Sequence, residues 1–232
     1  MKIKSSLILL VLGILTGPLF GQVGTLDTRK DLGEFMIKIQ NARILNPDDY
    51  KKEFEGSPFL SDVWTQGIIF LQNDKSLEAT MLYDIYSQQM LVKKDEEILA
   101  LTQPYSIKKV VLGKQTFIWQ TYETGNKVEE SYFELLVDGE FQLFKKYNCN
   151  IVRADRQVSA YEGKPKDRFR ISTEYYLKVD PQKAIVFPNA RDNFFALFPS
   201  QKDTLIQYCR QNKLKLKKEE DLIKIFSYLN GK

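Results

Sequence analysis

Between Trp64 and Val152, short apolar runs alternate with turn residues, and this spacing constrains the fold more than any other feature. Connections this short can join only antiparallel strands, since parallel neighbours need a crossover of about a dozen residues or more. Strands are predicted over residues 64–71, 78–86, 89–93, 96–102, 107–112, 115–123, 131–137 and 140–152. Tight connections are predicted at Ser87-Gln88, Lys94-Asp95, Gly113-Lys114 and Asp138-Gly139. The region therefore predicts an antiparallel meander.

The most specific turn prediction is Asp138-Gly139, because both residues tolerate the positive φ of a type I′ turn. A two-residue loop would place Val137 opposite Glu140 and Phe133 opposite Phe144. Both faces of this hairpin carry apolar side chains. A half-solvated sheet would alternate more cleanly, so we expect a curled or two-sided, covered sheet.

The chain beyond the meander predicts a second hairpin over residues 168–179 and 183–187, followed by helices. Asn189 and Ser200 each stand three residues before an aspartate, a variant of the capping box. Three helices of about 9, 11 and 12 residues are predicted, too short to be stable alone in water. They should pack on the sheet.

The predicted fold class is α+β: a curved antiparallel β-meander of about eight to ten strands with a C-terminal helical layer. Residues 57–187 form the β-rich domain and residues 188–232 the helical tail. Residues 22–56 give a weak signal, with one short helix predicted near Leu32–Ile39 and a turn at residues 46–49.

The first residues have the three parts of a cleavable secretory signal peptide. Lys2 and Lys4 precede an apolar run over residues 7–15, which is about half the length of a membrane span. Cleavage is predicted after Gly21. Because no cysteine lies near this point, we expect an exported protein without a lipid anchor, in the periplasm or outside the cell.

Residues 22–232 carry 32 basic and 30 acidic side chains, because both lysines of the leader and no acid are removed with it. A near-balanced charge is unlike the concentrated basic face of nucleic-acid-binding proteins. Nucleic acid is therefore not an expected partner, and no second long apolar run predicts a membrane span.

Two cysteines, Cys149 and Cys209, permit a single intramolecular disulfide in an oxidising compartment. The alternative reading is that both thiols are small apolar core residues. Cys149 alternates with Tyr147 and Ile151, and Cys209 follows Leu205 by one helical turn, which favours the core reading.

The chain has no histidine, which excludes Ser-His-Asp and Cys-His catalysis and every histidine metal site. No calcium loop, P-loop or dinucleotide motif is present, so no cofactor and no metal is expected. Neighbouring carboxylates occur at Asp48-Asp49, Glu96-Glu97 and Glu129-Glu130. Adjacent residues of a strand point to opposite faces, so a catalytic carboxylate pair would have to come from separate strands.

Four lysines cluster at Lys213, Lys215, Lys217 and Lys218, with Leu214 and Leu216 between them. They are candidates for contact with an anionic surface, or for a solvated connection between two helices with Leu214 and Leu216 turned inward. The aromatic residues Trp64, Trp119, Tyr122, Tyr132 and Tyr147 could line a groove, but on strands such residues are more often core.

Three segments carry a family resemblance: GSPFLSDVWTQGIIF from Gly56, FELLVDGEFQLFKKYN from Phe133 and KKEEDLIKIFSYLN from Lys217. Together with the YDIY of residues 83–86 they resemble a family of exported proteins from Bacteroidota-type bacteria. No activity is assigned to that family, so the resemblance implies an exported envelope protein and no site residue.

The sequence thus favours a non-catalytic protein that binds another envelope protein or a cell-surface ligand. The alternative is a hydrolase that acts on glycan or peptide through carboxylates from separate strands.

Overall fold

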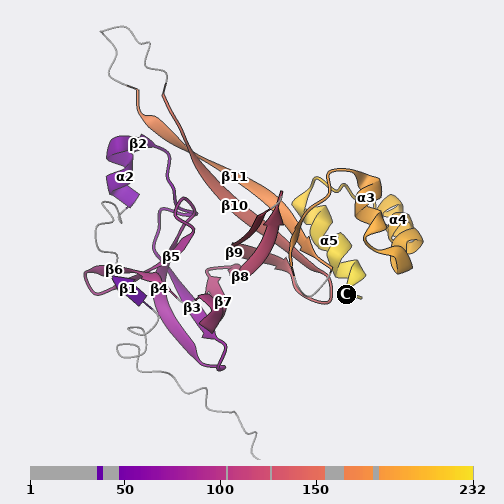
Figure 1. Ribbon diagram of the computed structural model, residues 1–232, viewed down its shortest axis with the longest axis horizontal. Coiled ribbons are helices and arrows are strands. Elements are labelled where there is room, and N and C mark those ends of the chain that lie inside the picture. Colours follow the sequence, from indigo (N-terminus) through magenta and orange to yellow (C-terminus); the bar gives the residue numbers. More distant parts are fainter. Residues whose placement is uncertain are drawn as a thin grey trace, which may run out of the picture.

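The computed structural model describes residues 36–38, 47–102, 104–125, 127–154, 165–179 and 183–231, so the predicted signal peptide lies outside the described residues. Within these ranges one twelve-stranded, almost entirely antiparallel sheet carries a C-terminal layer of short helices, which confirms the predicted fold class (Figure 1). The strands are β1 (Met36–Lys38), β2 (Phe54–Glu55), β3 (Thr65–Leu71), β4 (Ser76–Asp84), β5 (Gln89–Lys94), β6 (Glu97–Leu101), β7 (Ile107–Leu112), β8 (Gln115–Thr124), β9 (Lys127–Val137), β10 (Gln142–Val152), β11 (Asp167–Lys178) and β12 (Ile185–Val186). The helices are α2 (Pro47–Glu53), η1 (Pro104–Ser106), α3 (Arg191–Ala196), η2 (Pro199–Gln201), α4 (Lys202–Gln211) and α5 (Glu219–Leu229).

The strand order departs from a simple meander at two points. β7 pairs with β3 rather than with its predecessor β6, so the η1 connection passes from one edge of the β3–β6 group to the other. β2 pairs with β11 in parallel, over Asp167 and Arg168. Both departures depend on contacts between segments far apart in the sequence.

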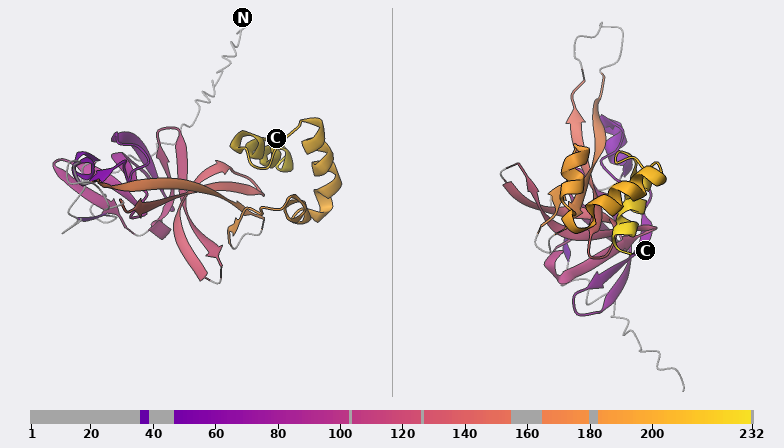
Figure 2. Two further views of the ribbon diagram at one scale, coloured as in Figure 1. Left: turned by 90° about the horizontal axis from the view of Figure 1, so that it is seen from above. Right: turned by 90° about the vertical axis from the view of Figure 1, so that its right-hand side faces the viewer.

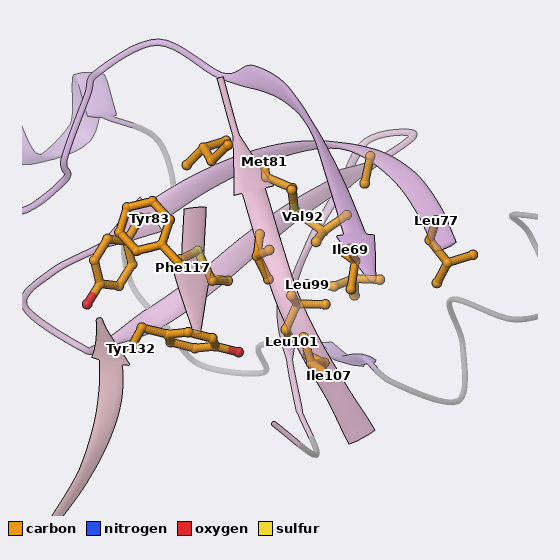
Figure 3. Packing of buried hydrophobic residues seen from close by; sticks show 14 of the residues in the cluster. Ile69, Leu77, Met81, Tyr83, Val92, Leu99, Leu101, Ile107, Phe117 and Tyr132 are labelled. Carbon is orange, nitrogen blue, oxygen red and sulfur yellow. The ribbon is translucent and has the colours of Figure 1, made fainter. Parts of the chain in front are cut away.

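The first half of the sheet curls around an apolar core. Alternating side chains of β3–β8 meet on its inner face (Figure 3). Met81, Tyr83 and Phe117 are among the fully buried members. The period of two in these strands thus produces a covered face, as the sequence predicts.

The second half of the sheet closes on itself through a backbone contact between β8 and the start of β12. The N–H of Ala184 donates to the carbonyl of Thr121, and the N–H of Glu123 donates to the carbonyl of Ala184, both at 3.2 Å. Strands β8–β12 therefore encircle a small aromatic core that includes Phe133, Phe144 and Tyr176.

A split between β9 and β10 is filled by the turn that joins β4 to β5. These strands pair only from Val137 to Glu134 on one side and from Leu143 to Lys145 on the other. Beyond that point the Gln88 amide donates to the carbonyl of Tyr147 at 3.1 Å and accepts from the Ser131 hydroxyl. Gln88 thus joins the two halves of the sheet.

The helical tail packs on the end of the sheet formed by β9, β10 and β11, and Figure 2 shows the helices grouped at that end. Its core contains Phe194, Phe226 and Leu222 from the helices and Leu143 and Leu177 from the strands, all fully buried. The predicted tail helices are present, although the first is only six residues long. The predicted caps are wrong, because Ala190 and Gln201 hold the N-cap positions without a side-chain bond.

The register predicted at Asp138-Gly139 is wrong. Val137 pairs with Leu143 instead of Glu140, and Phe144 pairs with Leu135 instead of Phe133. The cause is Asn230, whose side chain bonds to both backbone groups of Phe141 and so removes that residue from the ladder. By contrast, the predicted two-residue turn at Gly113-Lys114 is confirmed, since Leu112 pairs with Gln115.

Two predictions for the N-terminal segment are corrected. Met36–Lys38, expected within a helix, forms strand β1 beside β6. The expected turn around Pro47 is the start of α2. Proline suits the first helical position, because its missing N–H would have no partner there.

Candidate binding site

Among the described residues, the middle of β11 has an open edge. β10 pairs with one side of this strand along its length. On the other side, β2 pairs only with Asp167 and Arg168, and β12 only with Tyr176 and Leu177. Between them lie five consecutive exposed residues, Arg170–Glu174, which we call the edge window. Its length is about 17 Å at about 3.3 Å per residue.

The direction of the backbone groups in the edge window follows from the next hydrogen bond along the strand. The N–H of Phe187 donates to the carbonyl of Tyr175 at 2.9 Å, so Tyr175 turns its backbone groups away from β10. Backbone groups alternate between the two edges of an antiparallel strand. Ile171 and Thr173 therefore present their N–H and C=O groups at the open edge, and no partner for them lies among the described residues.

Each end of the edge window is bounded by a residue that interrupts strand pairing. Gly56 follows β2 with a φ of +75°, and a Cβ at this position would stand 3.2 Å from the carbonyl oxygen of Phe169. At the other end, pairing with β11 stops at Phe187, whose N–H makes the last bond of this segment to β11 among the described residues, and Pro188 follows directly. The chain leaves the edge of β11 at both points.

A groove of about 650 Å³ opens where the edge window meets the helical tail. Thr173–Tyr175 form its floor, and residues 186–189 together with Arg191 form one wall. The connection between α4 and α5, residues 214–217, forms the other wall. Phe187 and Leu216 give it a partly apolar lining.

The groove carries more positive than negative charge. Arg191, Lys215 and Lys217 line it, and none of the three forms an ion pair within the described part of the chain. The guanidinium of Arg191 lies 5.3 Å from the ring centre of Phe195, which supports its position. The one acidic residue among the described lining is Glu174, whose carboxylate accepts from Asn148 at 3.1 Å.

The four lysines singled out in the sequence are divided by this geometry. Lys215 and Lys217 line the groove. Lys213 stands in the turn after α4 with a φ of +53°, and Lys218 is the N-cap residue of α5. Leu214 is buried, as the connector reading predicts. Arg191 and Thr173 were missed, because their part in the groove depends on pairings that no local pattern reveals.

Comparison with protein-family models, curated proteins and solved structures finds no match to this chain.

A second polar cluster brings carboxylates from separate strands together. Glu129 of β9 accepts from the Tyr122 hydroxyl at 2.7 Å, and Glu174 of β11 lies opposite Lys146 in the register of β10 and β11. Burial lowers the pKa of Lys146, while the charges of Glu174 and Glu129 oppose that shift. The Lys146 ammonium bonds to Asn148 at 2.6 Å. The charged groups of this cluster therefore interact with their own neighbours in the sheet.

A third polar network joins the sheet to the helical tail. The Lys145 ammonium lies 2.8 Å from Glu219 of α5 and 3.4 Å from Glu134 of β9. Burial alone would lower the pKa of Lys145, but the bond to Glu219 and the charge of Glu134 raise it. Tyr175 donates to Glu219 at 2.8 Å, which places the start of α5 on the side of β11 that carries Tyr175.

The remaining predicted site residues belong to the core. Tyr122, Tyr132 and Tyr147 are buried, and Trp119 packs against the same cluster as Tyr132, which confirms the core reading for these aromatics. Trp64 packs against Phe59 and its neighbours.

Both cysteine thiols are free. Cys149 packs against the core of the first half of the sheet, whereas Cys209 lies in the core of the helical tail. Burial raises the pKa of the Cys149 thiol to about 11. The structure therefore does not bring the two sulfur atoms together.

Within the described ranges, no group of three or more acidic or cysteine side chains is arranged to hold a metal ion. No described helix is long and apolar enough to cross a membrane.

Proposed function

We propose that this chain is an exported, non-catalytic binding protein whose edge window accepts a short extended segment of a partner protein. The observation that carries the proposal is the open edge of β11 beside a groove of about 650 Å³. An extended peptide that adds a strand to such an edge gains main-chain hydrogen bonds, and a neighbouring groove provides selectivity for its side chains.

The bounded length of the edge window selects the kind of partner. β2 and β12 occupy the edge on both sides of Arg170–Glu174, so a long rigid strand of another sheet would collide with them. The same argument disfavours pairing with β11 of a second copy, because that strand is twelve residues long. A flexible segment can enter and leave the sheet within this span.

The alternative hydrolase has less support from the geometry. A glycosidase of the usual type needs two carboxylates on either side of the scissile bond. The described lining of the groove contributes only Glu174, which Asn148 already holds. Glu129 is likewise held by Tyr122.

Photo-crosslinking tests the proposal in the cells that produce the protein. A photoreactive side chain is placed at Thr173 or Ile171, and at exposed Lys114 as a control. We expect adducts from the first two positions that map to neighbouring alternate residues of one partner segment. Adducts that scatter over unrelated segments, or that form equally from Lys114, would contradict the proposal.

Export is proposed from the leader and is tested separately. The intact mass of the protein recovered outside the cytoplasm should correspond to a chain that begins at Gln22. A chain that retains residues 1–21 and stays in the cytoplasm would contradict it.

A further inference from the structure

The geometry points to an acidic partner segment, in which carboxylate side chains at alternate positions lie against Arg191, Lys215 and Lys217. This inference rests on the proposed function and adds the chemistry of the segment that the edge window accepts. It follows from the face of β11 over which these three cations lie.

The groove cations lie on one face of the sheet. Tyr175 turns its side chain to the face covered by the helical tail, since it packs in the tail core and donates to Glu219. Thr173 shares this face, because side chains two apart on a strand point the same way. Leu214 and Leu216, which flank Lys215, pack in the same core, and so do the neighbours of Arg191 in α3. The three cations thus stand above the Thr173 face.

An incoming strand must follow the same alternation. A residue that pairs with Thr173 directs its side chain to the face of the three cations. The next residue of the incoming strand pairs with Ser172 or Glu174 and directs its side chain to the opposite face, where the carboxylate of Glu174 would repel a second acid. The preferred pattern is therefore acidic at every second position and uncharged between.

Among the described residues, none of the three cations is paired with a carboxylate, so each can accept such a partner. Nearby carboxylates are already engaged: Glu219 is paired with Lys145, and the carboxylate of Asp221 accepts from the backbone N–H of Lys215. Within the described lining, three cations therefore stand against one carboxylate, that of Glu174, beside open main-chain donors and acceptors. An acidic extended peptide satisfies both.

Fluorescence anisotropy with three labelled synthetic peptides tests the inference. The peptides alternate threonine with glutamate, with glutamine or with lysine, and each is long enough to span the edge window. We expect the glutamate peptide to bind most tightly, the glutamine peptide more weakly and the lysine peptide most weakly. The advantage of the glutamate peptide should shrink as salt is added, because exposed charges are screened.

Matched variants separate the charge from the edge. Replacing Lys215 and Lys217 by glutamine should weaken binding of the glutamate peptide about fivefold and leave the glutamine peptide unchanged. Replacing the exposed Lys75 and Lys114, which carry the same charge away from the groove, should change neither. Thr173→Pro, which removes an open-edge donor, should weaken both peptides.

The outcomes distinguish the two proposals. If Thr173→Pro abolishes binding but the three peptides bind the unsubstituted protein equally, binding at the edge window is supported and the acidic inference is overturned. If none of the peptides binds, or if binding survives Thr173→Pro, both are overturned. Circular dichroism of each variant establishes that the fold is retained.

Discussion

The side-chain amide of Asn230, at the end of α5, holds both backbone groups of Phe141 in the loop between β9 and β10. It accepts from the Phe141 N–H at 2.9 Å and donates to the Phe141 carbonyl at 2.8 Å. These bonds join residues 89 apart in sequence and fix the helical tail to the sheet. Since the tail forms a wall of the groove, the shape of the groove depends on them.

Asn230→Ala should lower the free energy of unfolding by about 1–3 kcal/mol, because it leaves two partly buried backbone groups unpaired. Urea denaturation followed by tyrosine fluorescence measures the change. Asn212→Ala is the matched control, since Asn212 bonds only to the carbonyl of Tyr208 at the exposed end of α4. Equal effects of the two substitutions would contradict the role given to Asn230.

Gly139→Ala should be destabilising through a clash with Asn230. A Cβ at Gly139 would stand 2.5 Å from the side chain of Asn230, whereas one at Gly125 would meet nothing within 4 Å. Contacting sites couple in double-mutant cycles. The cost of Gly139→Ala should therefore fall in the Asn230→Ala background, while the cost of Gly125→Ala should not; additive costs for the first pair would contradict the close approach.

Adjacent lysines on β10 should respond oppositely to replacement by methionine. Lys145→Met leaves the buried Glu134 without its cation and should cost about 2 kcal/mol of stability. Lys146 is a buried cation whose pKa is lowered by burial, so Lys146→Met should be neutral within about 1 kcal/mol or stabilising. Thermal denaturation of both variants checks the order, and a larger loss for Lys146→Met would contradict it.

Asp84→Asn should stabilise the protein at neutral pH. The Asp84 carboxyl accepts from the N–H groups of Tyr86 and Ser87, and burial raises its pKa. Because this pKa is higher in the folded state than in the unfolded state, protonated Asp84 contributes to stability below about pH 4. That contribution is lost as the pH rises through the folded-state pKa. Asparagine keeps an acceptor without the charge. Urea midpoints at several pH values should show an advantage that disappears in acid; the reverse trend would contradict the assignment.

Much of the sheet can be predicted from sequence, because short apolar runs such as that within Thr65–Leu71 and glycine turns such as Gly113 are local signals. The predicted register of the hairpin at Asp138-Gly139 is wrong because Phe141 bonds to Asn230, a residue far away in the sequence. The groove could not be predicted for the same kind of reason. Lys215 and Lys217 are visible as charges, but the openness of β11 depends on where Gly56 and Pro188 take the chain away from its edge.

Proline substitutions test the orientation of the edge window within the folded protein. Thr173→Pro removes an N–H that faces the open edge and should cost about 1 kcal/mol or less. Ser172→Pro removes an N–H that faces β10 and should cost about 2 kcal/mol or more. Urea denaturation of the two variants gives the comparison, and a greater loss for Thr173→Pro would mean that the open edge is assigned to the wrong residues.

Amide hydrogen exchange at β11 tests the central claim most directly, because it observes the open edge and its occupation in one measurement. In the free protein the amides of Ile171 and Thr173 should exchange rapidly and those of Ser172 and Glu174 slowly, as their pairing with β10 requires. Addition of the peptide that alternates threonine with glutamate should slow Ile171 and Thr173 and leave Ser172 and Glu174 unchanged. Slow exchange of Ile171 and Thr173 in the free protein, or no change on adding the peptide, would contradict the account.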